Sequence, residues 1–275
     1  MLKKGMFILA CALSLSMFGA LNAPAFETLM LATTTSTDNT GLMDALAPKF
    51  KKDTGIEMKW TAVGTGKALE MGKNCDVDVL LVHAPAAEKK YVASGYGKDR
   101  TQVMYNDFVI IGPKDDPSNL KGKSSGDAMK KLVSGKVIFV SRGDNSGTHK
   151  KEISLWEAAG LAVPDKEKWY VQTGQGMIAT INVATEKNGY TMTDRGTFIK
   201  FADNHGGNPP LVPLVAGDPV LFNQYSIIAV NPANCRNAKY ELAKKFTAWM
   251  TSKKIQDWIG DFKLLNKKLF IPNAK

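Results

Sequence analysis

A nine-residue stretch between a predicted strand and a predicted helix carries side chains suited to holding an anion. Residues 141–149 read SRGDNSGTH, with three hydroxyl groups, one guanidinium and two glycines. Hydroxyl and guanidinium groups donate hydrogen bonds, and the backbone amides at a helix start attract negative charge. The stretch therefore predicts an oxyanion site that includes Arg142, Ser146 and Thr148.

Two stretches near the start of the chain have a similar composition. Residues 33–41 read TTTSTDNTG, and one helix cap would explain only one of their six hydroxyl groups. Gly64-Thr65-Gly66 also follows a predicted strand and opens a helix, so Thr65 joins the candidates. This second turn is not a nucleotide-binding loop, because Thr61 stands where that motif needs glycine and Ala68 where it needs a hydroxyl.

Two further glycine turns lie later in the chain, each at a predicted helix start. Residues 173–177 read TGQGM, and residues 194–197 read DRGT. Arg195 is the second arginine in such a turn, so we interpret it as a possible anion ligand. A salt bridge from Arg195 to Asp194 or to another carboxylate is the alternative.

Strands and helices alternate along the chain, which predicts the α/β fold class with mainly parallel sheets. Strands are predicted at 27–32, 56–63, 76–82, 103–112, 137–141, 190–193, 211–215 and 225–230. In open α/β sheets, binding turns gather at the carboxyl ends of the strands. Two domains that face each other would bring these turns to one cleft, which can close on a small ligand.

The first 25 residues have the pattern of a signal peptide. Lys3 and Lys4 precede an apolar run, residues 6–18, that is too short to span a bilayer, and Ala23-Pro24-Ala25 fits a cleavage site. We expect cleavage after Ala25 and an exported mature chain that is soluble or loosely held at a membrane by a partner; the resemblance described below implies the periplasm.

The formal net charge of +10 does not indicate nucleic-acid binding. Only four of the 36 basic residues are arginine, the lysines are scattered along predicted helix exteriors, and no nucleic-acid motif is present. Asp76 and Asp78 share a strand face, but no histidine or further carboxylate accompanies them, so we predict no metal ligands. The mature chain keeps Cys75 and Cys235, which an exported protein can pair, and a single optional disulfide is our hypothesis.

Seven stretches occur in order over nearly all of the mature chain: TTTSTDNTG, AVGTGKALEMGKN, DVDVLLVHAP, YNDFVIIGP, SRGDNSGTHKKE, GQGM and YTMTDRGT. Together they resemble the tungstate-binding periplasmic proteins of bacterial ABC importers. One departure is Cys75, which stands where the family pattern has glycine and leaves the geometry of that turn open.

The resemblance implies a two-domain periplasmic-binding-protein fold of type II, with a ligand cleft between domains joined by two connecting strands. We place the signal peptide at 1–25, domain I at 26–107 and 226–275, and domain II at 108–225. The implied function is binding of tungstate or molybdate and delivery to an ABC permease and ATPase by a monomer without a cofactor. Carried over by motif, the ligand residues are Thr34, Thr35 and Ser36 in one domain and Arg142 and Thr148 in the other.

Two other functions remain open at this point. The first is a phosphate or sulfate binder of the same fold. Phosphate carries a proton near pH 7 and favours a site with an acceptor carboxylate, which Asp144 or Asp194 would supply if not already engaged. A hydrolase would use Ser146, His149 and an aspartate, but no G-x-S-x-G elbow is present. We therefore expect no enzyme activity, and we interpret His149 as holding its loop through a ring hydrogen bond.

Overall fold

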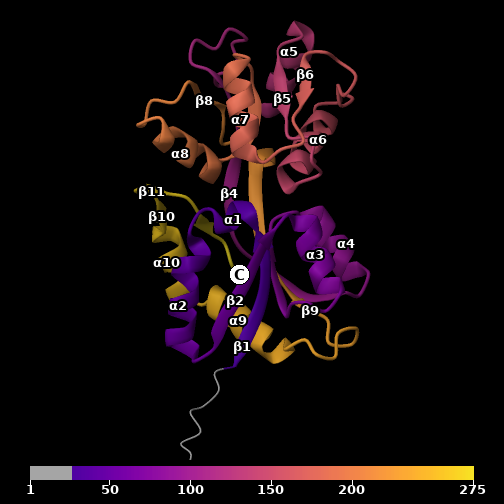
Figure 1. The fold of residues 1–275 in the computed structure, drawn as a ribbon, viewed down its shortest axis with the longest axis vertical. Helices are drawn as coiled ribbons and strands as arrows, with labels where there is room; N and C mark the ends of the chain where they lie inside the picture. The colour runs from indigo at the N-terminus through magenta and orange to yellow at the C-terminus, as the bar shows by residue number, and fades with distance from the viewer. Residues whose placement is uncertain (1–26) are drawn as a thin grey trace, which may run out of the picture.

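The computed structural model describes residues 27–275, so the predicted signal peptide at 1–25 lies outside the described residues. The described chain forms two lobes that two long strands, β4 and β9, connect (Figure 1). None of the helices within residues 27–275 combines the length and the apolar character that a bilayer crossing requires.

The first lobe contains both ends of the described chain (Figure 1). Its N-terminal elements are β1 (Thr28–Thr34), α1 (Thr35–Asp38), α2 (Leu42–Thr54), β2 (Glu57–Val63), α3 (Thr65–Lys73), β3 (Val79–Val82), α4 (Pro85–Ala93) and β4 (Gly97–Pro113). Its C-terminal elements are β9 (Phe222–Val230), α9 (Tyr240–Thr251), α10 (Lys253–Asp261), β10 (Lys263–Leu264), β11 (Lys267–Lys268) and β12 (Ile271–Pro272).

The second lobe is built from the middle of the chain. Its elements are α5 (Ser125–Gly135), β5 (Phe139–Ser141), α6 (Gly147–Ala158), β6 (Tyr170–Gln172), α7 (Met177–Glu186), β7 (Thr191–Asp194), α8 (Arg195–Asn204), β8 (Leu211–Val215) and the 3-10 turn η1 (Pro219–Leu221). The strands β7 and β8 both pair with the end of β4, which ties this lobe to the connecting strands.

The strand β4 belongs to both lobes. Its first part, from Gly97 to Asp107, pairs with β9 in the sheet order β12-β4-β9-β3-β1-β2. Its last part, from Phe108 to Pro113, pairs with β7 and β8. One continuous strand therefore passes from the core of the first lobe into the core of the second.

Alternating side chains along the strands supply two apolar layers in each lobe. In β1, Leu29 and Leu31 pack toward α2, α9 and α10, whereas Ala32 packs toward α3 on the other face. In the second lobe, Phe108 of β4 packs in one layer and its neighbour Val109 in the other. These buried layers hold the strand ends, and hence the turns that follow them, in fixed positions.

The prediction of mainly parallel sheets is wrong. The pairs β1–β2, β1–β3 and β5–β6 are parallel, but β4 and β9 pair antiparallel with each other and with every other named strand that they contact. The reason is topological, because these two strands cross between the lobes in opposite directions.

One smaller prediction also needs correction. We expected a strand from Val103, but β4 already begins at Gly97. Pro48 lies inside α2, which runs through it without a break. The end of the chain after Lys263 forms β12, which pairs with β4.

The two cysteines of the mature chain form a disulfide in the first lobe. Cys75 and Cys235 are bonded, with their Cα atoms 5.3 Å apart. Cys75 has a backbone φ of 67°, in the left-handed region that favours glycine. This explains why glycine suits the position, and it shows that a cysteine there forms the same kind of turn and also closes a loop with a sequence separation of 160.

We predict that replacing both cysteines, as Cys75→Ser with Cys235→Ser, lowers the unfolding free energy by about 2–5 kcal/mol. The bond closes a long loop, so its loss gives the unfolded chain more freedom. Urea unfolding of the variant beside oxidised and reduced wild type measures the difference. Two free thiols in the denatured, unreduced wild type would contradict the bond itself.

Candidate functional site

A polar cleft of about 330 Å³ lies between the two lobes. The structure brings seven of the eight predicted ligand residues to its walls. Thr34, Thr35, Ser36 and Thr65 line it from the first lobe, and Arg142, Ser146 and Thr148 line it from the second. Residues more than a hundred positions apart therefore share one cavity.

The ends of parallel strands determine where these side chains lie. Thr34 ends β1 and is in register with Val63, the last residue of β2, so the turns after both strands lie side by side. His83 directly follows β3, which pairs with β1 in parallel. On the second lobe, Ser141 ends β5 in the same way. The cleft thus forms where carboxyl ends of strands from both lobes face each other.

Four helices begin at this cleft. The helices α1, α3 and α6 start at residues of its main part, and α7 starts at an adjoining hollow of about 310 Å³ that shares Thr35, Ser36 and Arg142. Glycine is the N-cap residue of both α3 (Gly64) and α7 (Gly176), so no capping side chain occupies the first amides of these helices. Their first amides are available to an anion, and each helix start adds about 0.3–1 kcal/mol of attraction.

The hydroxyl of Thr34 is the centre of a buried hydrogen-bond group. It lies 2.7 Å from the Thr37 hydroxyl and 2.9 Å from Nε2 of His83, and it accepts a bond from the Thr37 amide at 3.2 Å. The Ser36 hydroxyl lies 3.1 Å from the same ring nitrogen. The positions of these hydroxyl groups are therefore set by protein contacts before any ligand arrives.

Arg142 is the guanidinium of the cleft. Its Nη2 donates to Asp144 Oδ2 at 2.5 Å, while its Nε is buried and has no protein partner. The other carboxylate oxygen, Oδ1, accepts from the Ser146 amide. Burial opposes ionisation of Asp144, but hydrogen bonds from Ser146 and the charge of Arg142 outweigh it and hold the pKa of that carboxyl below its ordinary value.

The loop that carries Arg142 is anchored by a buried glutamate behind it. Glu152 Oε2 accepts from the Ser141 hydroxyl at 2.6 Å, and its Oε1 accepts from Tyr170 and Trp156. Burial raises the pKa of Glu152, and these three donors oppose the rise. Gly143, with φ of 62°, lies so close to Gln172 that a Cβ there would be 2.8 Å from its side chain. A residue larger than glycine would therefore clash at this point of the loop.

The lobes approach each other closely at Thr65. A Cβ placed on Gly147 would lie 3.5 Å from the Thr65 hydroxyl and 3.6 Å from the His83 ring. The Thr65 hydroxyl is buried and has no partner. Thr65 on one wall and Arg142 on the other thus each have a buried donor without a protein partner, and an unpaired buried donor is costly.

The structure does not bring Arg195 to the cleft. Its Nε and Nη2 donate to the two carboxylate oxygens of Asp107, each at 2.5 Å. This pair lies in a different hollow, beside the C-terminal tail. The prediction of Arg195 as an anion ligand is corrected for this reason, because its planar group already has a matched acceptor. The alternative of a salt bridge describes it, with Asp107 rather than Asp194 as the partner.

The neighbours of Arg195 do reach the adjoining part of the cleft. Asp194 and Thr197 line it, but the two carboxylate oxygens of Asp194 accept from the Thr197 amide at 2.9 Å and hydroxyl at 2.6 Å. Both Asp144 and Asp194 are therefore already engaged as acceptors.

A hydrolase arrangement of Ser146 and His149 is not formed. His149 Nδ1 accepts from the Asn145 amide at 3.0 Å, and the Ser146 hydroxyl caps α6 by accepting from the His149 amide. Among residues 27–275, no hydrogen bond joins the Ser146 hydroxyl to the His149 ring. The ring holds its own loop, as the sequence predicted.

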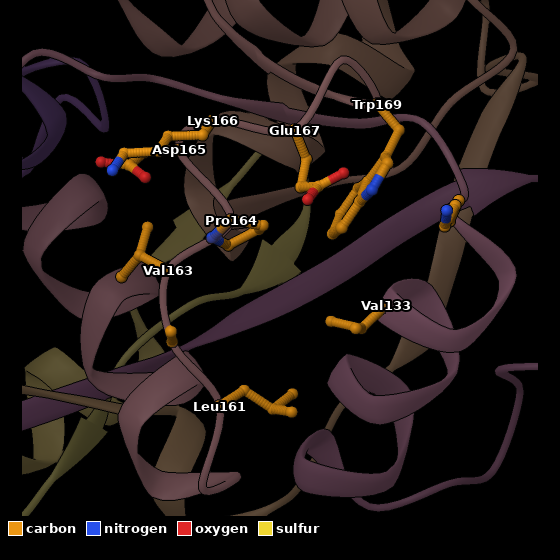
Figure 2. A pocket seen from close by; sticks show the side chains of 10 residues that line it. Val133, Leu161, Val163, Pro164, Asp165, Lys166, Glu167 and Trp169 are labelled. Atoms are coloured by element: carbon orange, nitrogen blue, oxygen red, sulfur yellow. The ribbon is translucent and has the colours of Figure 1, made fainter.

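A hollow of about 490 Å³ on the second lobe lacks the chemistry of the cleft. It has an apolar floor of Val133, Leu161, Val163, Pro164 and Trp169, with Asp165, Lys166 and Glu167 beside it (Figure 2). It contains none of the predicted ligand residues. Within residues 27–275, no group of three or more histidine, cysteine, aspartate or glutamate side chains could hold a metal ion.

Sequence reasoning missed His83 as a member of the site. The signal that would have found it is its position directly after β3, at the same sheet edge as Thr34 and Thr65. The neighbouring Lys67 also lines the cleft, although its turn was recognised.

Comparison with known proteins identifies the family. Residues 22–254 match the model of the PBP superfamily domain. The chain is 53% identical over 240 residues to the tungstate-binding protein TupA of Campylobacter jejuni, covering 87% of this chain and 89% of that protein. This chain belongs to the PBP superfamily and to its tungstate-binding protein family. The two-lobed α/β fold predicted from the motifs is thereby confirmed as a periplasmic-binding-protein fold.

Solved structures of the family agree with this fold. The tungstate-binding protein TupA from Desulfovibrio alaskensis is 65% identical, with a TM-score of 0.86, over 90% of this chain and 100% of that chain. A structure titled as the tungstate ABC transporter from Geobacter sulfurreducens is 46% identical, with a TM-score of 0.76, over 86% and 99% of the two chains.

We predict that acid destabilises the ligand-free protein partly through His83. Burial lowers the pKa of His83 from its ordinary 6.5, against opposing effects of the Asn223 hydrogen bond and the Asp194 charge. The unfolded chain then binds the proton first, so the contribution of the neutral ring is present above 6.5 and is lost as the pH falls below it.

His83→Gln should therefore show a shallower loss of unfolding free energy than wild type between about pH 7 and about pH 5. Urea unfolding across this range measures the slope. His205→Gln removes an exposed histidine and is the matched control, expected to follow wild type. Parallel slopes for His83→Gln and wild type would contradict the prediction.

Proposed function

We propose that this protein binds tungstate, or the closely similar molybdate, in the cleft and delivers it to an ABC permease and ATPase. The observation that carries the proposal is the pair of unpartnered buried groups, Arg142 Nε and the Thr65 hydroxyl, on opposite walls of one cavity. The ligand residues are Thr34, Thr35, Ser36, Thr65, Arg142, Ser146 and Thr148. The names of the relatives, tungstate-binding protein TupA, supply the identity of the anion.

The chemistry of the site favours an anion without a proton. Tungstate is a tetrahedral dianion near neutral pH, so it needs donors and no acceptor. Each charge-assisted hydrogen bond contributes about 1.5–3 kcal/mol net. Hydrogen phosphate also needs an acceptor, but each carboxylate oxygen of Asp144 and Asp194 already accepts one hydrogen bond from the protein. This arrangement disfavours the phosphate alternative.

The two lobes act as domains that close on the anion. We assign domain I to 26–107 with 226–275 and domain II to 108–225. Support comes from the apolar layers, since Met104 and Ile227 pack with the first lobe while Phe108 and Leu221 pack with the second. Tyr225, at the boundary of the assigned ranges, packs with the first lobe. Bending of β4 and β9 between these residues would open and close the cleft.

Export to the periplasm follows from the start of the sequence. We assign residues 1–25 to a signal peptide that is cleaved after Ala25. The mature protein then works as a monomer outside the cytoplasmic membrane, binds no nucleic acid, needs no cofactor and catalyses no reaction. A relative named as a putative ABC transporter anion-binding protein and a structure named as a tungstate ABC transporter support export and work with a transporter.

A competition titration tests the choice of anion. We expect tungstate and molybdate to bind in calorimetry, and sulfate and phosphate to compete weakly. Tryptophan fluorescence provides a second readout, because the indole of Trp60 donates a hydrogen bond to Asp38 near the first-lobe turn. Phosphate that competes as well as tungstate would overturn the assignment.

Arg142→Ala should weaken tungstate binding by about 1.5–3 kcal/mol, which is about tenfold to a hundredfold in Kd. It removes the cationic donor and leaves Asp144 to repel the anion. Arg142→Lys should restore part of the affinity, because lysine keeps the charge but not the planar fork. Calorimetry measures both, and Arg236→Ala at an exposed position controls for the change in net charge. Full affinity in Arg142→Ala would exclude that residue from the site.

Thr65→Val should weaken tungstate binding about threefold to tenfold without lowering the stability of the ligand-free protein. The hydroxyl has no protein partner to lose, so its removal harms only the complex. Thr33→Val is the matched contrast, because that buried hydroxyl donates to the Leu81 carbonyl at 2.8 Å. It should lower stability and leave affinity near wild type. The reverse pattern would place Thr65 outside the site.

A further inference from the structure

His83 connects the anion-binding turn to both connecting strands. Its ring is 7% exposed and stacks on Tyr225 of β9 with ring centroids 4.7 Å apart. One ring nitrogen faces the Thr34–Ser36 turn, and the other faces the amide of Asn223. The two nitrogens therefore have different neighbours and different tasks.

The Nδ1 side fixes the protonation of the ring. Nδ1 lies 2.9 Å from Asn223 Oδ1, and Asn223 Nδ2 donates to Asn106 Oδ1 at 2.8 Å. Because the amide presents its oxygen to the ring, Nδ1 must carry the hydrogen and donate it. In a neutral ring this leaves Nε2 with a lone pair, as an acceptor only.

The Nε2 side then fixes the direction of the hydroxyl groups. Thr34 Oγ1 already accepts from the Thr37 amide, and it is the nearer hydroxyl to Nε2, at 2.9 Å against 3.1 Å for Ser36. One acceptor lone pair takes one hydrogen, so Thr34 donates to the ring. Ser36 Oγ also lies 3.1 Å from Thr34 Oγ1, but the Thr37 hydroxyl, at 2.7 Å, is the nearer donor to the second lone pair of that oxygen. Ser36, which is partly exposed at the cleft, therefore keeps its hydrogen for the ligand.

We propose that His83 is a positioning residue of the oxyanion site, whose Nε2 takes the Thr34 hydroxyl hydrogen and so aims the Ser36 hydroxyl into the cleft as a donor. The inference rests on the proposed function, since the benefit of an aimed donor appears only when an anion binds. Without the acceptor, Thr34 would donate to a neighbouring hydroxyl, and the Ser36 hydrogen would no longer have a single direction.

Two substitutions separate the two sides of the ring. His83→Gln places an amide near the position of Nε2 and retains an acceptor for Thr34, but it loses the contact with Asn223. His83→Asn places an amide near the position of Nδ1 and retains the contact with Asn223, but it leaves Thr34 without the acceptor. A positioning role and a role in tethering the connecting strands therefore predict opposite orders of affinity.

Tungstate titration by calorimetry of wild type and both variants is the test, with thermal unfolding of each ligand-free protein as the check on folding. We expect His83→Asn to bind about tenfold more weakly than wild type and His83→Gln to stay within about threefold. Equal losses in the two variants, or weaker binding by His83→Gln, would overturn the inference. Wild type that fails to bind tungstate would instead overturn the proposed function.

A measurement on the wild-type protein decides the matter if a variant does not fold. Nitrogen-15 spectra of histidine-labelled protein report which ring nitrogen carries hydrogen. We expect His83 near neutral pH to be protonated at Nδ1 and bare at Nε2, with and without tungstate. A ring protonated at Nε2 contradicts the inference whether or not the anion binds.

Discussion

The site depends on one constraint, which is that a buried guanidinium atom and a buried hydroxyl have no partner in the protein itself. Arg142 Nε and the Thr65 hydroxyl lie on opposite walls of a cavity that four helix starts approach. Unpaired buried donors persist only where the rest of the fold holds them in place. A dianion placed between the walls would satisfy both at once.

The carboxylates near these donors already accept hydrogen bonds from the protein, and these bonds hold the loops in place. Glu152 accepts three hydrogen bonds behind the Arg142 loop, and Asp144 accepts from Arg142 and from the Ser146 amide. Asp194 is similarly engaged by Thr197. The negative charges near the cleft therefore organise its loops, and the surface left for a ligand consists mostly of donors.

Much of the fold was predictable because strands, turns and helices have recognisable patterns over short stretches of sequence. Apolar strands followed by glycine and hydroxyl turns indicated α/β units, and the order of motifs indicated the family. Sheet direction was not predictable in this way, since β4 and β9 are strands by local pattern whether they run parallel or antiparallel to their neighbours. The pairing of the C-terminal tail with β4 also depends on contacts far away in the chain.

The sequence by itself determined which residue types could bind an anion and that they follow strands. Hydroxyl and guanidinium side chains beside glycine, directly after an apolar run, can be read from the sequence without a structure. Only the tertiary structure decided which of them share the cleft. Arg142 and Arg195 occur in similar turns, yet Asp107 on β4 takes the guanidinium of Arg195. His83 lies in the DVDVLLVHAP stretch, which did not point to a role at the site, but the parallel pairing of β3 with β1 brings it against Thr34. Whether a residue reaches the cleft therefore depends on its partners in space, which the spacing of residues in the sequence does not give.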